Sequence, residues 1–196
     1  MRKKIFAITI LTILISGLCI ILAKPKSIKA SEDQCYNCHT SLDGKNLAPA
    51  KAYTQDIHFS KGITCADCHG GNSKTEDMDS AMSKANGFIG VPKSQERFKT
   101  CAKCHADEKV MKRYGSDLPT DQFEKLQSSV HSKSSSDSKG YIADCITCHS
   151  VHDIASVKSP ASKVYPTKIP ALCGSCHSNA NFMKQYNPKM PVDQVA

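Results

Sequence analysis

The sequence predicts a mainly α-helical fold with extensive irregular structure and little or no sheet. Two observations support this prediction. The motif Cys-x-x-Cys-His occurs five times in 196 residues, and the segments between its copies are short. The chain has no Trp, six Phe and six Tyr, which is too little apolar side chain for an ordinary core. We therefore expect short helices after the motifs, joined by long irregular connections.

Each copy of the motif predicts a site for covalent haem attachment. Two thiols at this spacing reach the two vinyl groups on one edge of a porphyrin, and the imidazole that follows them ligates the iron. The porphyrins then form the apolar core, and the segments between the motifs wrap around them. The sequence predicts five covalent haem c groups, bound by Cys35, Cys38, His39, Cys65, Cys68, His69, Cys101, Cys104, His105, Cys145, Cys148, His149, Cys173, Cys176 and His177.

Zinc binding and disulfide formation are the alternative uses of these cysteine pairs. Neither use needs a histidine directly after the second cysteine. Because the chain has only 8 His, five such histidines would arise by chance in on the order of one sequence in ten million. The motif series therefore favours haem.

The first thirty residues, 1–30, predict a signal peptide or a membrane anchor. Residues 5–23 carry no charge, and basic residues flank them on both sides. This uncharged run is longer than a signal-peptide core of about 7–15 residues and close to the roughly 20 residues that span a bilayer. We expect an exported protein in the periplasm or on the outer face of the cytoplasmic membrane, anchored there if the leader is uncleaved.

The formal net charge of +8 comes mainly from this leader. It holds six of the 26 basic residues and no acidic residue, so residues 31–196 contain 20 basic and 18 acidic residues. A nucleic-acid-binding protein would need a clustered basic patch. The sequence therefore predicts no nucleic-acid partner.

Residues 31–196 contain an internal repeat. A shift of 72 residues aligns 101–122 with 173–194 without a gap, and Met111 aligns with Met183. In a more diverged copy, residues 53–58 align with 126–131, so that His58 matches His131. We therefore expect one haem-binding domain, 31–196, built from units of about 31–96 and 97–168 and a truncated unit, 169–196.

The unit predicts two helices between successive motifs. Residues 106–114 continue from a motif and stop at Gly115, where a helix can end. Pro119 opens a second segment, in which Phe123, Leu126 and Val130 lie on one face. This second segment ends at His131.

Three histidines outside the motifs are candidate sixth ligands of iron. His58 and His131 occupy the same place in the repeat, and His152 lies three residues after His149. Ligation by two histidines gives six-coordinate iron of low potential, which is suited to the transfer of single electrons. The predicted iron ligands are His39, His69, His105, His149, His177, His58, His131 and His152.

At least two of the five haems need a sixth ligand other than histidine. Methionine is the first candidate, and Met111 and Met183 are equivalent in the repeat, although methionine near a porphyrin more often packs than ligates. The residue equivalent to His131 in the last unit would fall beyond Ala196. We therefore expect that one haem, that of His177 or a neighbour, lacks its histidine partner.

These features resemble the exported multihaem c-type cytochromes of anaerobic respiratory chains. The resemblance rests on the motif series, on the segments that end at His58 and His131, and on the run Cys148-His149-Ser-Val-His152-Asp. It implies an electron-transfer protein and not an enzyme. The implied role is to carry single electrons between the membrane quinone pool or another cytochrome and a redox partner of the cell envelope.

Two alternatives stay open. The apolar leader close to the first motif is also similar to the membrane-bound tetrahaem quinol dehydrogenases, which pass electrons to periplasmic reductases. Ser41, however, stands where that family has Met, and the motif count is five. A reductase of small nitrogen or sulfur compounds would need acid–base groups beside an open iron, and the sequence does not place them.

The number of haems can be checked by mass spectrometry of the denatured protein. The mass should exceed that of the polypeptide by about five times the mass of one haem, because thioether bonds survive denaturation. A zinc-loaded or disulfide-linked product without haem would rule out this interpretation.

Overall fold

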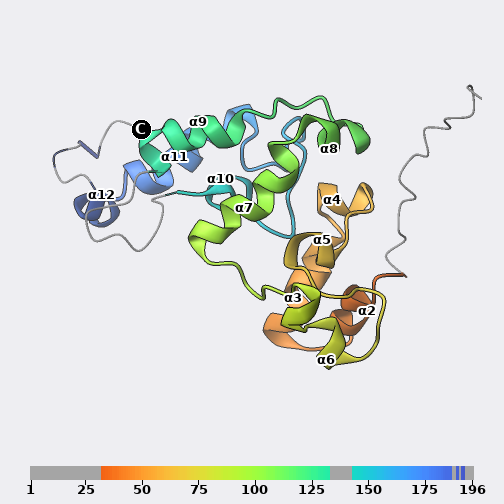
Figure 1. Cartoon of the computed structure of the whole chain (residues 1–196). Coiled ribbons are helices and arrows are strands. Elements are labelled where there is room, and N and C mark those ends of the chain that lie inside the picture. Colours follow the sequence, from red (N-terminus) through yellow and green to blue (C-terminus); the bar gives the residue numbers. More distant parts are fainter. Residues whose placement is uncertain (1–31, 133–142, 187–188, 190, 193–196) are drawn as a thin grey trace, which may run out of the picture.

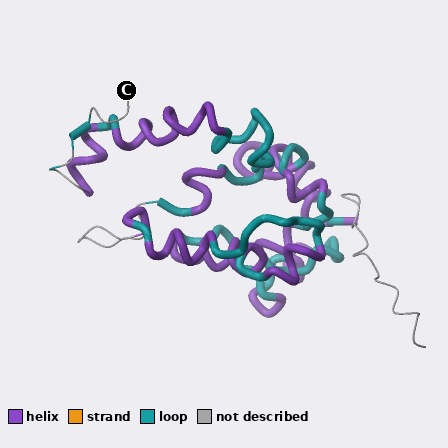
Figure 2. Tube along the Cα trace, turned by 90° about the horizontal axis from the view of Figure 1, so that it is seen from above, coloured by secondary structure: helices purple, strands orange, loops and turns teal. Residues whose placement is uncertain are grey.

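The computed structural model describes residues 32–132, 143–186, 189 and 191–192. These residues form helices and loops, and none of them lies in a β-strand (Figure 2). The predicted fold class, mainly α with extensive irregular structure, is confirmed for this part of the chain. The predicted leader, 1–30, lies outside the described residues. Within the ranges given above, no helix is long and apolar enough to cross a membrane.

The helices are short, as expected. The N-terminal half contains α2 (Gln34–Thr40), α3 (Gly44–Tyr53), α4 (Ile57–Ser60), α5 (Cys65–His69), α6 (Met78–Ala81) and the 3-10 helix η2 (Lys84–Asn86). The C-terminal half contains α7 (Ser94–His105), α8 (Glu108–Arg113), α9 (Gln122–Ser128), η3 (Val130–Ser132), α10 (Cys145–His149), η4 (Pro166–Lys168), α11 (Ile169–His177) and α12 (Ala180–Tyr186).

Figure 1 shows α2, α3 and α6 at one end of the molecule, α11 and α12 at the other, and α7 between them. Helix α2 packs against α3 and α5, and α5 in turn packs against α7. Helix α7 also contacts α8, α9 and α10, while α11 contacts α12. Helix α7 therefore contacts helices from both halves of the described chain.

All five motifs lie inside helices, whereas we expected helices to follow them. The motifs fall in α2, α5, α7, α10 and α11. The reason is geometric: residues at positions i, i+3 and i+4 share one helix face, so a helical turn brings two cysteines and a histidine together. The next helix then needs its own start. Helix α8 begins at Glu108 because the Asp107 side chain accepts hydrogen bonds from the backbone N–H groups of Lys109 and Val110.

Helix bounds follow the 72-residue shift seen in the sequence. Helix α7 ends at His105 and α8 begins at Glu108, while α11 ends at His177 and α12 begins at Ala180. Met111 and Met183, which align in the repeat, are both buried with 6% of their surface exposed. The second expected segment forms α9, but His131 lies in the 3-10 turn η3 that follows it and not at the end of the α-helix.

The described residues contain very few buried apolar side chains. They are Ala50, Phe98, Met111 and Met183. Buried polar side chains are more numerous in the same ranges: Asp33, Asp56, Thr64, Ser132, Asp144 and Ser162. Four apolar side chains cannot supply the core that a chain of this length needs. The protein part alone therefore agrees with the expectation that bound porphyrins provide most of the apolar surface.

Candidate haem-binding sites

The ten motif cysteines are all within the described residues, and none of them is in a disulfide bond. Their thiols are therefore available for thioether bonds. Each pair sits one helical turn apart in its motif helix, with the motif histidine next to the second cysteine. Every predicted attachment residue is thus placed on a helix in the arrangement that its chemistry requires.

Six of the eight histidines form three pairs of facing rings. The ring centroids are 5.9 Å apart for His58 and His105, 6.0 Å for His69 and His152, and 6.1 Å for His131 and His177. Each pair joins one motif histidine to one of the three histidines outside the motifs, His58, His131 and His152, which we call the free histidines. The partners come from segments that are far apart in the sequence.

The spacing of these pairs fits one metal ion between two imidazoles. A metal–imidazole bond is about 2 Å long, so a metal held by a nitrogen of each ring requires a gap of this size. Ordinary packed aromatic rings can also lie at such distances. The spacing points to a metal because of how the histidines are paired: every pair joins one motif histidine to one histidine outside the motifs. The residues present therefore fit haem iron with two histidine ligands at three sites.

Two of the pairs are equivalent in the repeat and have the same geometry. The ring planes of His58 and His105 are 87° apart, and those of His131 and His177 are 85° apart. The third pair, His69 and His152, is nearly parallel at 19°. Pairs that are equivalent in the sequence repeat therefore also have equivalent ring orientations.

The sequence led us to expect that the haem of His177 or a neighbour lacks its histidine partner, and the described residues show no facing histidine for the neighbour His149 but do show one for His177. His131 faces His177 with a ring-centroid distance of 6.1 Å. His58 and His131 each face the second motif that follows them in the chain, His105 and His177. A histidine equivalent to His131 in the last unit would therefore not serve His177.

His39 and His149 are the two motif histidines for which the described residues show no facing histidine ring. Met111 and Met183 are buried in α8 and α12. Both stay candidate iron ligands.

Strained backbone places His152 beside His69. His152 has φ +63° and Ser150 has φ +74°, a region that residues other than glycine rarely adopt. The equivalent of Ser150 after the second motif is Gly70, with φ +68°. Such strain costs on the order of 1–3 kcal/mol and is typical of functional sites. It turns the chain directly after His149 so that His152 reaches a different motif.

In two motif histidines, a hydrogen bond at Nδ1 leaves Nε2 available to bind a metal. Nδ1 of His39 lies 3.1 Å from the Asn46 carbonyl oxygen, and Nδ1 of His69 lies 2.8 Å from that of Gly90. Because a carbonyl only accepts, Nδ1 carries the proton in both rings and Nε2 has a free lone pair. This is the tautomer that binds a metal through Nε2.

Burial keeps other rings neutral. It lowers the pKa of His105, and the neighbouring His58 and His149 lower it further. Burial also lowers the pKa of His149 and of His152, the latter with help from His69. Neutral imidazole is the form that ligates metals.

Asp56 is a buried carboxylate behind His58. Its Oδ1 lies 2.7 Å from Nδ1 of His58 and accepts the backbone N–H of His58 at 2.9 Å. Its Oδ2 accepts the backbone N–H of Ile154 at 2.8 Å. Burial alone raises the pKa of Asp56, but these hydrogen bonds outweigh it and hold the pKa below its usual value. Asp56 therefore remains charged and orients the His58 ring.

Asp33 joins the first two motif helices. Its Oδ1 accepts from the backbone N–H groups of Cys35 and Tyr36, and its Oδ2 accepts from that of Cys65 at 3.0 Å. The N-terminal N–H groups of a helix have no partner inside the helix. One buried carboxylate thus caps α2 and also fixes the start of α5 beside it.

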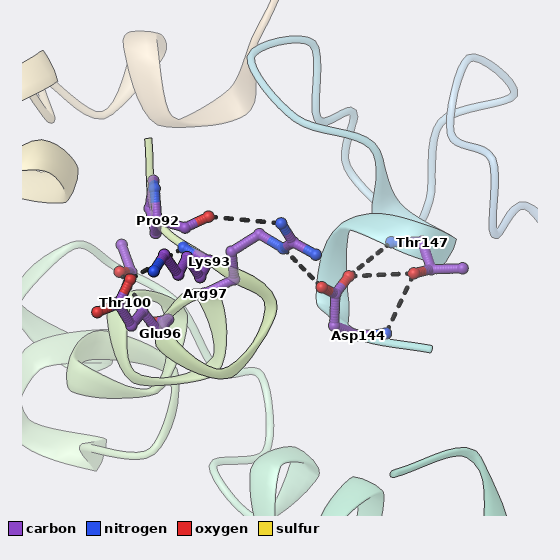
Figure 3. A network of polar contacts seen from close by, with 7 residues as sticks. All are labelled: Pro92, Lys93, Glu96, Arg97, Thr100, Asp144 and Thr147. Carbon is purple, nitrogen blue, oxygen red and sulfur yellow. Dashed lines mark hydrogen bonds and ion pairs between the residues drawn. The ribbon is translucent and has the colours of Figure 1, made fainter. Parts of the chain in front are cut away.

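An ion pair between Arg97 and Asp144 joins the third and fourth motif helices (Figure 3). Arg97 Nε lies 2.6 Å from Asp144 Oδ2, and the Asp144 side chain is only 3% exposed. The other oxygen of Asp144 accepts from the backbone N–H and the hydroxyl of Thr147, which closes the cap of α10. This network holds α7 and α10 together.

Asp33, Asp56 and Asp144 were not singled out in the sequence. The available signal was their position, one or two residues before a motif or a free histidine, where aspartate is a strong N-cap. Their second contacts, to Cys65, Ile154 and Arg97, join segments that are distant in the chain. Local sequence gives no sign of such contacts.

Further contacts bring the remaining neighbouring motifs together in chain order. The Lys103 ammonium in α7 donates a hydrogen bond to the backbone carbonyl of Asp67 in α5. Cys145 raises the pKa of Cys101, and Cys101 lowers that of Cys145, so the third and fourth motifs also lie close together. Burial raises the pKa of Cys148, and the adjacent Cys173 and Cys176 raise it further, so the last two motifs are also close.

Two family models match the chain. The model described as cytochrome c3 matches residues 57–178, and the model described as cytochrome c554 and c-prime matches residues 21–70. The first match covers more than half of the chain and contains four of the five motifs. No curated protein and no solved structure matches the chain.

The ion pair of Arg97 can be tested by its effect on stability. Arg97→Gln should lower the free energy of unfolding by about 1–3 kcal/mol, because it leaves the buried Asp144 carboxylate without its charged partner. Chemical denaturation of the haem-loaded protein, followed by circular dichroism, measures this change.

Lys112→Gln is a matched control for this variant. Lys112 also pairs with a carboxylate, that of Glu108, but both side chains are more than 60% exposed. Its loss should change stability little, because water screens exposed pairs. Equal effects of the two substitutions would show that the Arg97–Asp144 pair contributes no more than a surface pair.

Proposed function

Because the cytochrome c3 model matches more than half of its residues, the chain belongs to the cytochrome c3 family, and we propose that it carries single electrons between partners in the cell envelope. Proteins of this family are multihaem c-type cytochromes with covalent haem c, and they are typically electron carriers. For this chain the proposal is five such groups, one at each motif.

The observation that carries the proposal is the set of three facing histidine pairs. Bound haem supplies an iron that is oxidised and reduced by one electron at a time. We assign His58 and His105, His69 and His152, and His131 and His177 as the residues that would hold the iron at three of the sites. With haem bound, two histidine ligands would leave no coordination position of the iron open, which favours electron transfer over the binding of a substrate.

The protein contributes spacing and rigidity. Specific contacts join the first four motif helices in chain order: the Asp33 carboxylate, the Lys103–Asp67 hydrogen bond and the Arg97–Asp144 ion pair. Transfer between redox centres needs short and constant distances. The order of these contacts favours transfer along the chain from one motif to its neighbour in sequence.

Export and partners are part of the same proposal. Cytochromes of this family are typically exported to the periplasm, and the uncharged run at residues 5–23 is consistent with export. We propose that electrons enter from the membrane quinone pool or another cytochrome and leave to an envelope redox partner. Whether the leader is retained as an anchor decides how close the first site lies to the membrane.

The ring orientations predict two kinds of low-spin ferric signal in low-temperature electron paramagnetic resonance. Parallel imidazole planes act on the same iron d orbital and separate it in energy from its partner, which gives a rhombic signal. Perpendicular planes leave the two orbitals nearly degenerate, which gives a strongly anisotropic signal. We therefore expect one rhombic signal, from His69 and His152, and two strongly anisotropic signals, from the two perpendicular pairs.

Ligand variants connect each signal to its pair. His152→Ala should remove the rhombic signal, and His58→Ala or His131→Ala should remove one anisotropic signal each, with a high-spin signal in its place. Covalent haem should be retained, because the motif cysteines are intact. Leu118→Ala, at an exposed position, is the control and should change none of them. The ligand assignment is wrong if all three histidine variants keep the wild-type spectrum.

A further inference from the structure

The two perpendicular histidine pairs differ in the residue behind the free histidine. Residues 53–58 align with 126–131 in the repeat, so Asp56 and Ser129 occupy the same position, two residues before His58 and His131. We propose that Asp56 is a positioning residue that acts through His58 to lower the midpoint potential of the site of His105, and that Ser129 leaves the equivalent site of His177 without this effect. The inference rests on the ligand assignment proposed above.

The two sites are otherwise closely matched. Their ring centroids are 5.9 and 6.1 Å apart, and their ring planes are at 87° and 85°. Both motif histidines end a helix, α7 or α11, that is followed after two residues by a helix with a buried methionine, Met111 or Met183. Among the described residues, the two copies of this site thus differ at the position two residues before the free histidine, where only one copy has a carboxylate.

Asp56 accepts hydrogen bonds from three donors. They are Nδ1 of His58 at 2.7 Å, the backbone N–H of His58 at 2.9 Å and the backbone N–H of Ile154 at 2.8 Å. If Nε2 of His58 ligates iron, Nδ1 carries the proton, so the direction of the first bond is fixed. The carboxylate is 4% exposed, and water therefore screens its charge poorly.

Ser129 cannot have the same effect. Its hydroxyl is neutral, and it donates a hydrogen bond to the Leu126 carbonyl oxygen at 2.7 Å. It can neither place a negative charge behind His131 nor draw on the Nδ1 proton as a carboxylate does. The difference between the two positions is therefore one of charge as well as of hydrogen bonding.

A carboxylate behind a ligating histidine favours the oxidised metal. It makes the imidazole a stronger donor and adds a negative charge close to the iron, and both effects stabilise the ferric state over the ferrous state. An electron shared between the two sites then resides preferentially on the side of His177. Asp56 thereby gives the two copies of one site different midpoint potentials, and electron transfer between them a preferred direction toward the site of His177.

Asp56 also connects this site to a second one. The backbone of Ile57 and Ile154 is joined by a hydrogen bond of 2.8 Å from the N–H of Ile57 to the carbonyl of Ile154. Ile154 follows His152, the residue that faces His69, by two positions. The Asp56 segment therefore holds both free histidines, His58 and His152, in fixed places.

Reciprocal substitutions test the inference in the haem-loaded protein. Redox titration is followed through the strongly anisotropic paramagnetic resonance signals. Asp56→Ser should raise the midpoint potential of one of these two sites. Ser129→Asp should lower the potential of the other by a smaller amount, because His131 is exposed and water screens a charge beside it more strongly.

Two further variants complete the test. Asp56→Asn keeps the size of the side chain and one of its two acceptor oxygens but removes the charge, and it should also raise the potential, which covers the case that Asp56→Ser does not fold. Asp77→Ser is the control: Asp77 caps α6, a four-residue helix like α4, through a hydrogen bond from Ser80, but at an exposed site. It should leave both potentials unchanged.

The outcomes separate this inference from the ligand assignment. If both Asp56 variants leave the potentials unchanged while His58→Ala converts one haem to high spin, the inference is overturned and the ligand assignment stands. If His58→Ala leaves all spin states unchanged, the assignment fails and the inference fails with it.

Discussion

The requirement that one helical turn present two thiols and an imidazole on the same face shapes most of this molecule. Every motif has to be helical, yet each motif helix is too short to be stable alone in water. The N-terminal N–H groups of these helices need partners, and the motif faces need apolar cover. Buried aspartates meet the first need for α2 and α10. The second is left to the cofactors, since the described residues bury so few apolar side chains of their own.

The same requirement explains why the fold is held by specific polar contacts. In an ordinary domain, distant segments are joined by a shared apolar core. Here Asp33 joins α2 to α5, Arg97 joins α7 to α10, and Asp56 joins α4 to the segment after His152. At least one partner in each of these contacts lies within two residues of a motif or of a free histidine. The residues that stabilise the protein are therefore also those that position its redox sites.

Much of this arrangement could be predicted from the sequence, because the relevant signals are local. The Cys-x-x-Cys-His spacing directly indicates covalent haem attachment, and the repeat indicated His58 and His131 as candidate iron ligands. Which histidine faces which motif could not be predicted, since that depends on how the chain returns on itself. For this reason the expectation that His177 or a neighbour lacks a histidine partner could not say which of them it is, and among the described residues it is the neighbour His149 that has no facing histidine. The tertiary contacts of Asp33, Asp56 and Asp144 could not be foreseen either, because each joins residues that no local pattern relates.

Under the proposed export and ligand assignment, the strained turn at Ser150 and His152 has a consequence for the assembly of the molecule. A chain that emerges with its N-terminus first presents His58 before His105 and His131 before His177, so each of these pairs can close as soon as its motif appears. His69 emerges long before His152. Its site stays open while two more motifs are delivered, and it closes only when the turn after the fourth motif has formed. In this proposal, completion of the second haem site would depend on the arrival of the fourth motif, and a chain that stops short of residue 152 would leave His69 without its facing histidine.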